Sequence, residues 1–146
     1  MWSSKAQLGG RVMRLFIIIF IFAAFILTAS GAAAADSLFD GTKPLICASR
    51  EVVDCTPGET CDKGLPEEMG APMFLAIDFI KKDITGPKRT SKITLIEKTD
   101  AQITLYGFEI SMGWSMVLDR ETGRMTATLA GKDQAFIIFG ACTTVK

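Results

Sequence analysis

The carboxy-terminal half of this chain contains four apolar segments, and only a few turn-forming residues separate each one from the next. The segments are rich in Ile, Phe, Thr, Val and Trp, which favour strands. Connections this short make neighbouring strands antiparallel, because a parallel crossover needs about a dozen residues or more. We therefore predict antiparallel strands over residues 103–110, 112–118, 124–130 and 134–142.

The preceding residues continue this pattern less clearly. Residues 73–80 and 92–98 alternate apolar and polar side chains as strands do, and residues 86–89 (GPKR) form a turn between them. Prolines and glycines predict a loop over residues 56–72. The predicted fold class is all-β: an antiparallel meander that forms a small barrel or half-barrel.

Residues 45–54 fit two structures. As a strand they place Ile46, Ala48 and Val52 on one face, and as a helix they bring Leu45, Ala48 and Val52 together. We favour the strand, because the turn that follows would make this segment the first arm of a hairpin.

Alternation along the predicted strands gives the candidate core. Phe139 falls on the opposite face from Phe136, which predicts either the far layer of a barrel or a surface patch. The predicted core positions are Leu75, Ile77, Phe79, Ile93, Leu95, Ile103, Leu105, Trp114, Met116, Leu118, Met125, Ala127, Leu129, Phe136 and Ile138.

The four cysteines predict two disulfides. Cys55 and Cys61 flank a Pro-Gly turn, so a bridge between them costs little chain entropy to close. Cys47 is then left to pair with Cys142, and loop-closure entropy gives this long-range bridge about 4–5 kcal/mol of stability. We expect no zinc site, because the chain has no C-x-x-C pair and no histidine. No other metal and no cofactor is predicted.

Residues 1–35 have the composition of a secretory signal peptide. Basic residues precede an apolar run, and small residues follow it up to Ala33 and Ala35, which fit the A-x-A pattern that signal peptidase requires. We predict cleavage after Ala35, with Ala34 as the near alternative, and a periplasmic or secreted location for the remaining domain, residues 36–146. The alternative is an uncleaved membrane anchor, although the most apolar stretch has roughly 15 residues and a spanning helix needs about 20.

The charge distribution argues against a nucleic-acid partner. The chain has 16 basic and 16 acidic residues, and residues 1–35 contain three of the basic residues and none of the acidic ones. The predicted domain therefore has 13 basic and 16 acidic residues, a net charge of −3. Its basic residues cluster only as the pairs 81–82 and 88–89, which is too little for a nucleic-acid surface.

The chain has no histidine, and this excludes Ser-His-Asp and Cys-His nucleophile systems and histidine metal sites. Asp78 interrupts an apolar strand, but its outward phase is typical of a solvated residue rather than of a catalytic carboxylate. Asp119 and Glu121 lie in a sequence that suits a hairpin turn and lacks the spacing of a calcium loop. We therefore predict no catalytic residues and no enzyme.

Two further residues have both a structural and a ligand-contact interpretation. Trp114 shares its strand phase with Met116 and Leu118, which favours a core position, and contact with a ligand is the alternative. Gly140 could admit a ligand, or it could mark a β-bulge or a close backbone contact.

Several short motifs extend over most of the predicted domain. They are DGTKPLIC at residues 40–47, CTPGETC at 55–61, GWS at 113–115, DRETGRMTAT at 119–128 and FIIFGAC at 136–142. In these motifs the chain resembles a group of small exported proteobacterial proteins. The resemblance implies an envelope or secreted location and no particular activity.

The function that we expect is non-enzymatic binding by an exported domain. The ligand would be a small apolar molecule in a barrel mouth, or a protein along a sheet edge. An alternative is an enzyme inhibitor, because periplasmic lysozyme inhibitors are also small exported β-barrels with disulfides. A carboxylate-based hydrolase is a third and less favoured hypothesis. We expect contact with a membrane only through an uncleaved signal segment.

Overall fold

A computed structural model of the protein describes residues 38–145, in which regular structure consists of strands alone. The predicted signal segment and its cleavage site lie outside the described residues. Residues 38–145 include no helix with the length and apolarity needed to cross a membrane. The strands are β1 (Leu45–Cys55), β2 (Asp62–Gly64), β3 (Phe74–Asp78), β4 (Asp83–Thr85), β5 (Thr90–Lys98), β6 (Gln102–Glu109), β7 (Met112–Asp119), β8 (Arg124–Ala130) and β9 (Ala135–Thr144).

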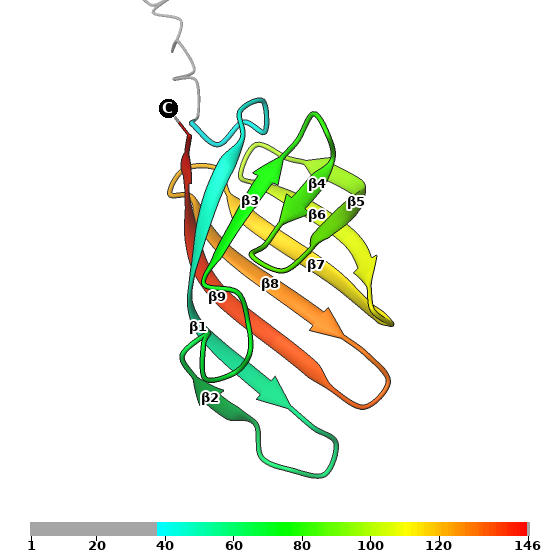
Figure 1. The fold of residues 1–146 in the computed structure, drawn as a ribbon. Coiled ribbons are helices and arrows are strands. Elements are labelled where there is room, and N and C mark those ends of the chain that lie inside the picture. The colour runs from blue at the N-terminus through cyan, green and yellow to red at the C-terminus, as the bar shows by residue number, and fades with distance from the viewer. Residues whose placement is uncertain (1–37, 146) are drawn as a thin grey trace, which may run out of the picture. The chain divides into compact units, whose positions relative to one another are not determined.

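All strands except β2 close into one antiparallel barrel (Figure 1). From β3 to β9, each strand pairs with the next one in the chain. β9 then pairs with β1, and β1 pairs with β3, so the ring has no break. This confirms the all-β prediction and selects the closed barrel over the half-barrel.

β1 is long enough to pair with two strands along the same side. Its first half pairs with β3, where Leu45 lies opposite Ile77, and its second half pairs with β2, where Val52 lies opposite Gly64. β1 and β2 form a hairpin across the turn between Cys55 and Cys61. The strand and hairpin predicted from residues 45–54 are therefore confirmed, and the helix is excluded.

Both predicted disulfides are present. Cys55–Cys61 closes the β1–β2 hairpin. Cys47 and Cys142 lie directly opposite each other in the β1–β9 pair and are bonded within the core. The long-range bridge thus links the two strands that close the ring. Disulfides of this kind indicate an oxidising, extracellular-type environment.

The core is the inward face of the barrel, and it contains most of the predicted positions. Leu75, Trp114, Leu129 and Phe136 are only partly buried and pack against the rest. Phe139 is 40% exposed, so the face opposite Phe136 is an outer surface rather than a second buried layer. The buried apolar residues are Phe39, Leu45, Cys47, Val52, Ile77, Phe79, Ile84, Ile93, Ile103, Leu105, Met116, Leu118, Met125, Ala127, Ile138 and Cys142.

The prediction of Leu95 as a core residue is wrong, because its side chain is 50% exposed. A β-bulge lies between Ile93 and Leu95 in the β5–β6 pair. The extra residue reverses the inward and outward alternation, so that Ile96 rather than Leu95 packs against the core.

The prediction that Ile46, Ala48 and Val52 share one face of β1 is wrong. Leu45 and Cys47 are buried, and Ile46 is 42% exposed. A bulge between Ser49 and Glu51 then shifts the phase, so that Val52 is buried and Ile46 is exposed.

Gly140 in β9 lies opposite Ser49 at this bulge. A Cβ at Gly140 would overlap the carbonyl group of Ala48 and the side chain of Met125. The close backbone contact, rather than a ligand, therefore accounts for this glycine.

Two short strands were missed by the sequence prediction. β2 lies in the predicted loop, and β4 begins at Asp83, where charged residues were expected to end a strand. Each has three residues, which is too few for an alternating pattern to be visible. Both are strands because the neighbouring strands β1, β3 and β5 offer free backbone partners.

One end of the barrel is covered by the segment that precedes β1. Phe39 is buried there against Gly123, where a Cβ would overlap the aromatic ring. Lys98 Nζ donates hydrogen bonds to the carbonyl oxygens of Asp40 at 3.0 Å and Gly41 at 3.1 Å, which holds the segment in place. The opposite end carries the β4–β5, β6–β7 and β8–β9 turns and the loop between β2 and β3 (Figure 1).

Candidate ligand-binding site

A cavity of about 1040 Å³ opens at this opposite end of the barrel. Its lining comes from the β2–β3 loop, the β4–β5 and β6–β7 turns and residues of all eight strands of the barrel, among them Ile46 of β1, Ile84 of β4 and Ser91 of β5. Small-molecule sites usually have roughly 300–1,000 Å³, so this volume is at the upper end of that range. The closed barrel therefore contains room for a sizeable ligand.

The floor of the cavity is apolar. Ile84, Met116, Ala127 and Ile138 line it, and each of these side chains is buried within the core. Leu129 in β8 extends this surface toward the mouth. No polar group of the floor residues is available to bind a charged ligand, so the floor suits an alkyl or ring surface.

The rim of the cavity combines exposed apolar side chains with charged ones. Met73, Phe74 and Ile110 line the mouth and are 43%, 56% and 69% exposed. Methionines also lie at the mouth and on the floor, and their flexible side chains can adapt to ligands of different shape. The apolar surface thus continues from the floor to the solvent.

Four charged residues stand at this rim: Glu67, Lys88, Arg89 and Glu109. Arg89 Nε lies 3.5 Å from Glu109 Oε1, an ion pair that links the β4–β5 turn with the end of β6, the strand next to β5. Their charges sum to zero, so the rim selects for polarity rather than for one sign of charge.

Trp114 lies in the inward phase of β7 and lines the cavity. It is partly buried, and its indole Nε1 donates a 2.9 Å hydrogen bond to Ser91 Oγ on β5. Gly107 lies directly opposite on β6 and leaves the space that the indole ring occupies. The Trp114 side chain therefore both packs against the core and borders the cavity. Contact between Trp114 and a ligand is accordingly part of the function proposed below.

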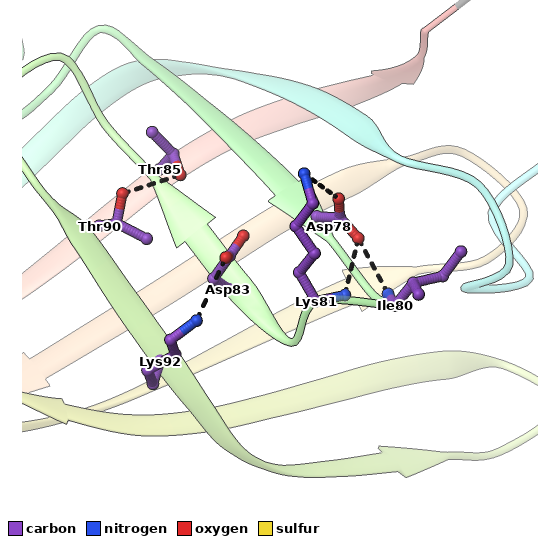
Figure 2. A network of polar contacts seen from close by, with 7 residues as sticks. All are labelled: Asp78, Ile80, Lys81, Asp83, Thr85, Thr90 and Lys92. Atoms are coloured by element: carbon purple, nitrogen blue, oxygen red, sulfur yellow. Dashed lines mark hydrogen bonds and ion pairs between the residues drawn. The ribbon is translucent and has the colours of Figure 1, made fainter.

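The candidate carboxylate Asp78 has a structural task at the end of β3. Asp78 Oδ1 accepts hydrogen bonds from the backbone amides of Ile80 at 3.0 Å and Lys81 at 2.9 Å (Figure 2). The amide of Lys81 is the main cause that lowers the pKa of the Asp78 carboxyl below its usual value of 3.8. An ionised side chain that holds a turn is not suited to proton transfer at neutral pH.

Asp119 holds the β7–β8 turn in the same way. Its Oδ1 accepts hydrogen bonds from the amide of Thr122 at 2.6 Å and the amide of Glu121 at 3.0 Å. The hydrogen bond from the Thr122 amide is the main cause that lowers the pKa of the Asp119 carboxyl. Within residues 38–145, no three His, Cys, Asp or Glu side chains are grouped so that they could hold a metal ion.

Sequence reasoning missed most of the cavity lining. Residues 56–72 were predicted as a loop with no part in a site, yet Met69 and Ala71 pack against the core and Ala71 lines the cavity, as does the next loop residue, Met73. The available signal was the apolar content of this loop: Leu65, Met69, Ala71 and Met73 are unusual in a freely solvated segment.

The short motifs noted in the sequence lie along the barrel wall as well as in its turns. GWS places Trp114 at the cavity, and FIIFGAC contains the floor residue Ile138 and the disulfide partner Cys142. Comparisons of the chain with protein-family models, with curated proteins and with solved structures find no match.

Proposed function

We propose that this protein is a non-enzymatic binding protein that holds a small apolar ligand in the open end of its barrel. The observation that supports this most is the cavity of about 1040 Å³ with a buried apolar floor. Apolar surface left open to water is costly, and a ligand that covers it gains the corresponding free energy.

We also propose that the protein is exported to an oxidising compartment. The two disulfides indicate an oxidising environment. Together with the signal composition of residues 1–35, they support export to the periplasm or out of the cell. Mass spectrometry of the periplasmic protein tests this, because export with cleavage gives an amino terminus at Asp36 and an anchor leaves Met1 in the membrane fraction.

Residues 36–146 provide a direct assay of binding, because they contain all the strands and both disulfides. Trp2 belongs to the predicted signal, so Trp114 is the single tryptophan of this domain, and it borders the cavity. We expect an apolar dye such as anilinonaphthalene sulfonate to quench or shift the Trp114 emission as it binds.

A variant that fills the floor gives the decisive comparison. Ala127→Leu adds bulk to the cavity floor and should lower dye affinity by about tenfold or more, since it removes apolar contact area. Ala141→Leu on the exposed outer face of β9 is the control and should bind as the parent does. Equal dye affinity in all three folded proteins would exclude the cavity as the site.

A second candidate function is protein inhibition, and the Cys55–Cys61 loop is the observation in its favour. Residues 56–61 are exposed and their ends are fixed by the disulfide, which makes a rigid protruding loop. A loop that is already fixed loses little conformational entropy when it enters an enzyme cleft. Inhibition of lysozyme by the domain, lost in Glu59→Ala, would support this function, and unimpaired lysozyme activity would count against it.

A further inference from the structure

The β6–β7 turn at the cavity mouth has an unusual residue for its backbone. Ile110 and Ser111 connect the strands with φ angles of 45° and 63°. Two-residue hairpin turns with positive φ at both positions favour Asn-Gly, because a branched Cβ is strained there. Isoleucine is among the least suitable residues at this position, so the stability of the turn does not explain it.

Packing within the protein does not explain Ile110 either. Its side chain is 69% exposed and lines the mouth of the cavity, as do Met73 and Phe74. Met73 and Phe74 are consecutive residues where β3 begins, and Ile110 comes from the β6–β7 turn, which is distant in the sequence. A strained residue that is exposed beside a binding cavity points to contact with a ligand.

A compact apolar ligand would fill the floor and leave these rim side chains in water. An extended chain would contact the floor with its end and the rim with its outer part. At the same rim stand the charged side chains of Lys88, Arg89, Glu109 and Glu67, which offer a polar group both signs of charge and hydrogen bonds. The cavity is therefore apolar at its floor, and its rim offers both apolar and charged side chains.

Resting on the proposed function, we infer that the ligand is an amphiphile with one long alkyl chain, and that Ile110 contacts the outer part of that chain. The end of the chain lies on the floor formed by Met116, Ala127 and Ile138. The polar head remains at the charged rim. Ile110 is thus a determinant of chain length rather than of folding.

The test uses octanoate, dodecanoate and hexadecanoate below their micelle concentrations, with Trp114 emission as the signal. Affinity should rise by about fourfold for each added methylene that remains within the apolar lining, from a transfer free energy of ~0.8 kcal/mol per methylene. The parent domain is compared with the double variant Ile110→Asn, Ser111→Gly, whose residues suit the turn.

The double variant should separate binding from stability. Its melting temperature should rise by about 4 °C or more, because the strain at the turn is relieved. Its affinity for hexadecanoate should fall by roughly fourfold or more, and its affinity for octanoate should not change, because the short chain does not reach the rim. Ile80→Asn, an 84% exposed isoleucine in the β3–β4 connection, is the control and should bind every probe as the parent does.

Each outcome has a separate meaning. If the parent domain binds none of the three probes, the proposed function itself fails. If octanoate binds as tightly as hexadecanoate, the ligand is compact and the chain inference is overturned. If the double variant keeps the parent affinity for hexadecanoate, or melts below the parent, the role assigned to Ile110 is overturned.

Discussion

Trp114 and Gly107 form a cross-strand pair in which a small residue makes room for a large one. They lie directly opposite each other in the β6–β7 register, and the indole ring covers Gly107. The hydrogen bond from the indole to Ser91 fixes the edge of the ring as well. The position of this ring at the cavity therefore depends on β5 and β6 as much as on its own strand.

Gly107→Ala should consequently displace the ring. An added Cβ would overlap Trp114 and lie 2.6 Å from the carbonyl oxygen of Lys92, which belongs to the backbone of the sheet and cannot easily move. We expect a loss of about 1–3 kcal/mol in the free energy of unfolding and a red shift of Trp114 emission. Gly113→Ala is the control, because a Cβ there meets nothing within 4 Å. Urea unfolding gives the free energy of unfolding of both variants. Equal losses of this free energy in Gly107→Ala and Gly113→Ala would contradict this account.

At the scale of elements, two connections between strands depend on an ionised aspartate. Asp78 holds the β3–β4 turn and Asp119 holds the β7–β8 turn through backbone amide hydrogen bonds (Figure 2 shows the first). The pKa values of both carboxyls are lowered in the folded protein. Each turn therefore favours the charged form of its aspartate.

These lowered pKa values predict the direction of the pH dependence of stability. A carboxyl with a lower pKa in the folded state stabilises the fold fully above its unfolded value near 3.8, and the contribution is lost as the pH falls through the folded value. The melting temperature should thus fall on acidification to about pH 2, and less steeply in Asp119→Asn. The control is Asp133→Asn in the exposed β8–β9 turn, whose melting temperature should depend on pH as the parent's does. If the melting temperature of Asp119→Asn falls with pH as steeply as the parent's, the prediction is contradicted.

At the scale of the whole molecule, the ring is closed by its first and last long strands, β1 and β9. Their pairing joins residues that are far apart in the sequence, and the Cys47–Cys142 bridge spans 95 residues. The Cys55–Cys61 bridge spans 6 residues and holds only the β1–β2 hairpin, whose second strand lies outside the ring. The two disulfides should therefore contribute unequally to stability.

Removing each bridge separately tests this difference. Cys47→Ala with Cys142→Ala should cost about 4–5 kcal/mol of unfolding free energy, and Cys55→Ser with Cys61→Ser roughly half as much, because loop-closure entropy grows with loop length. Urea denaturation of the parent and of the two double variants shows which bridge contributes more to the free energy of unfolding. A larger loss from the local bridge would show that the hairpin, rather than ring closure, limits stability.

The sequence alone determined those features that depend on short-range patterns. Alternating residues and short turns predicted β6 to β9 closely, since each of these strands borders its chain neighbour. The Pro-Gly turn between Cys55 and Cys61 predicted the local bridge and, by elimination, the other one. Trp114 was identified as a residue of interest, but nothing in its neighbouring residues showed that it borders a cavity.

Tertiary structure alone decided how these pieces meet. Bulges in β1 and β5 place Ile46 and Leu95 on the opposite face from the one that simple alternation predicts. A bulge is an extra residue opposite the partner strand, and the sequence of the bulged strand alone does not reveal it. The short strands β2 and β4 exist only because longer strands offer them backbone partners. The cavity belongs to this same level: its walls come from segments distant in the sequence, and they enclose a volume only after β9 has paired with β1.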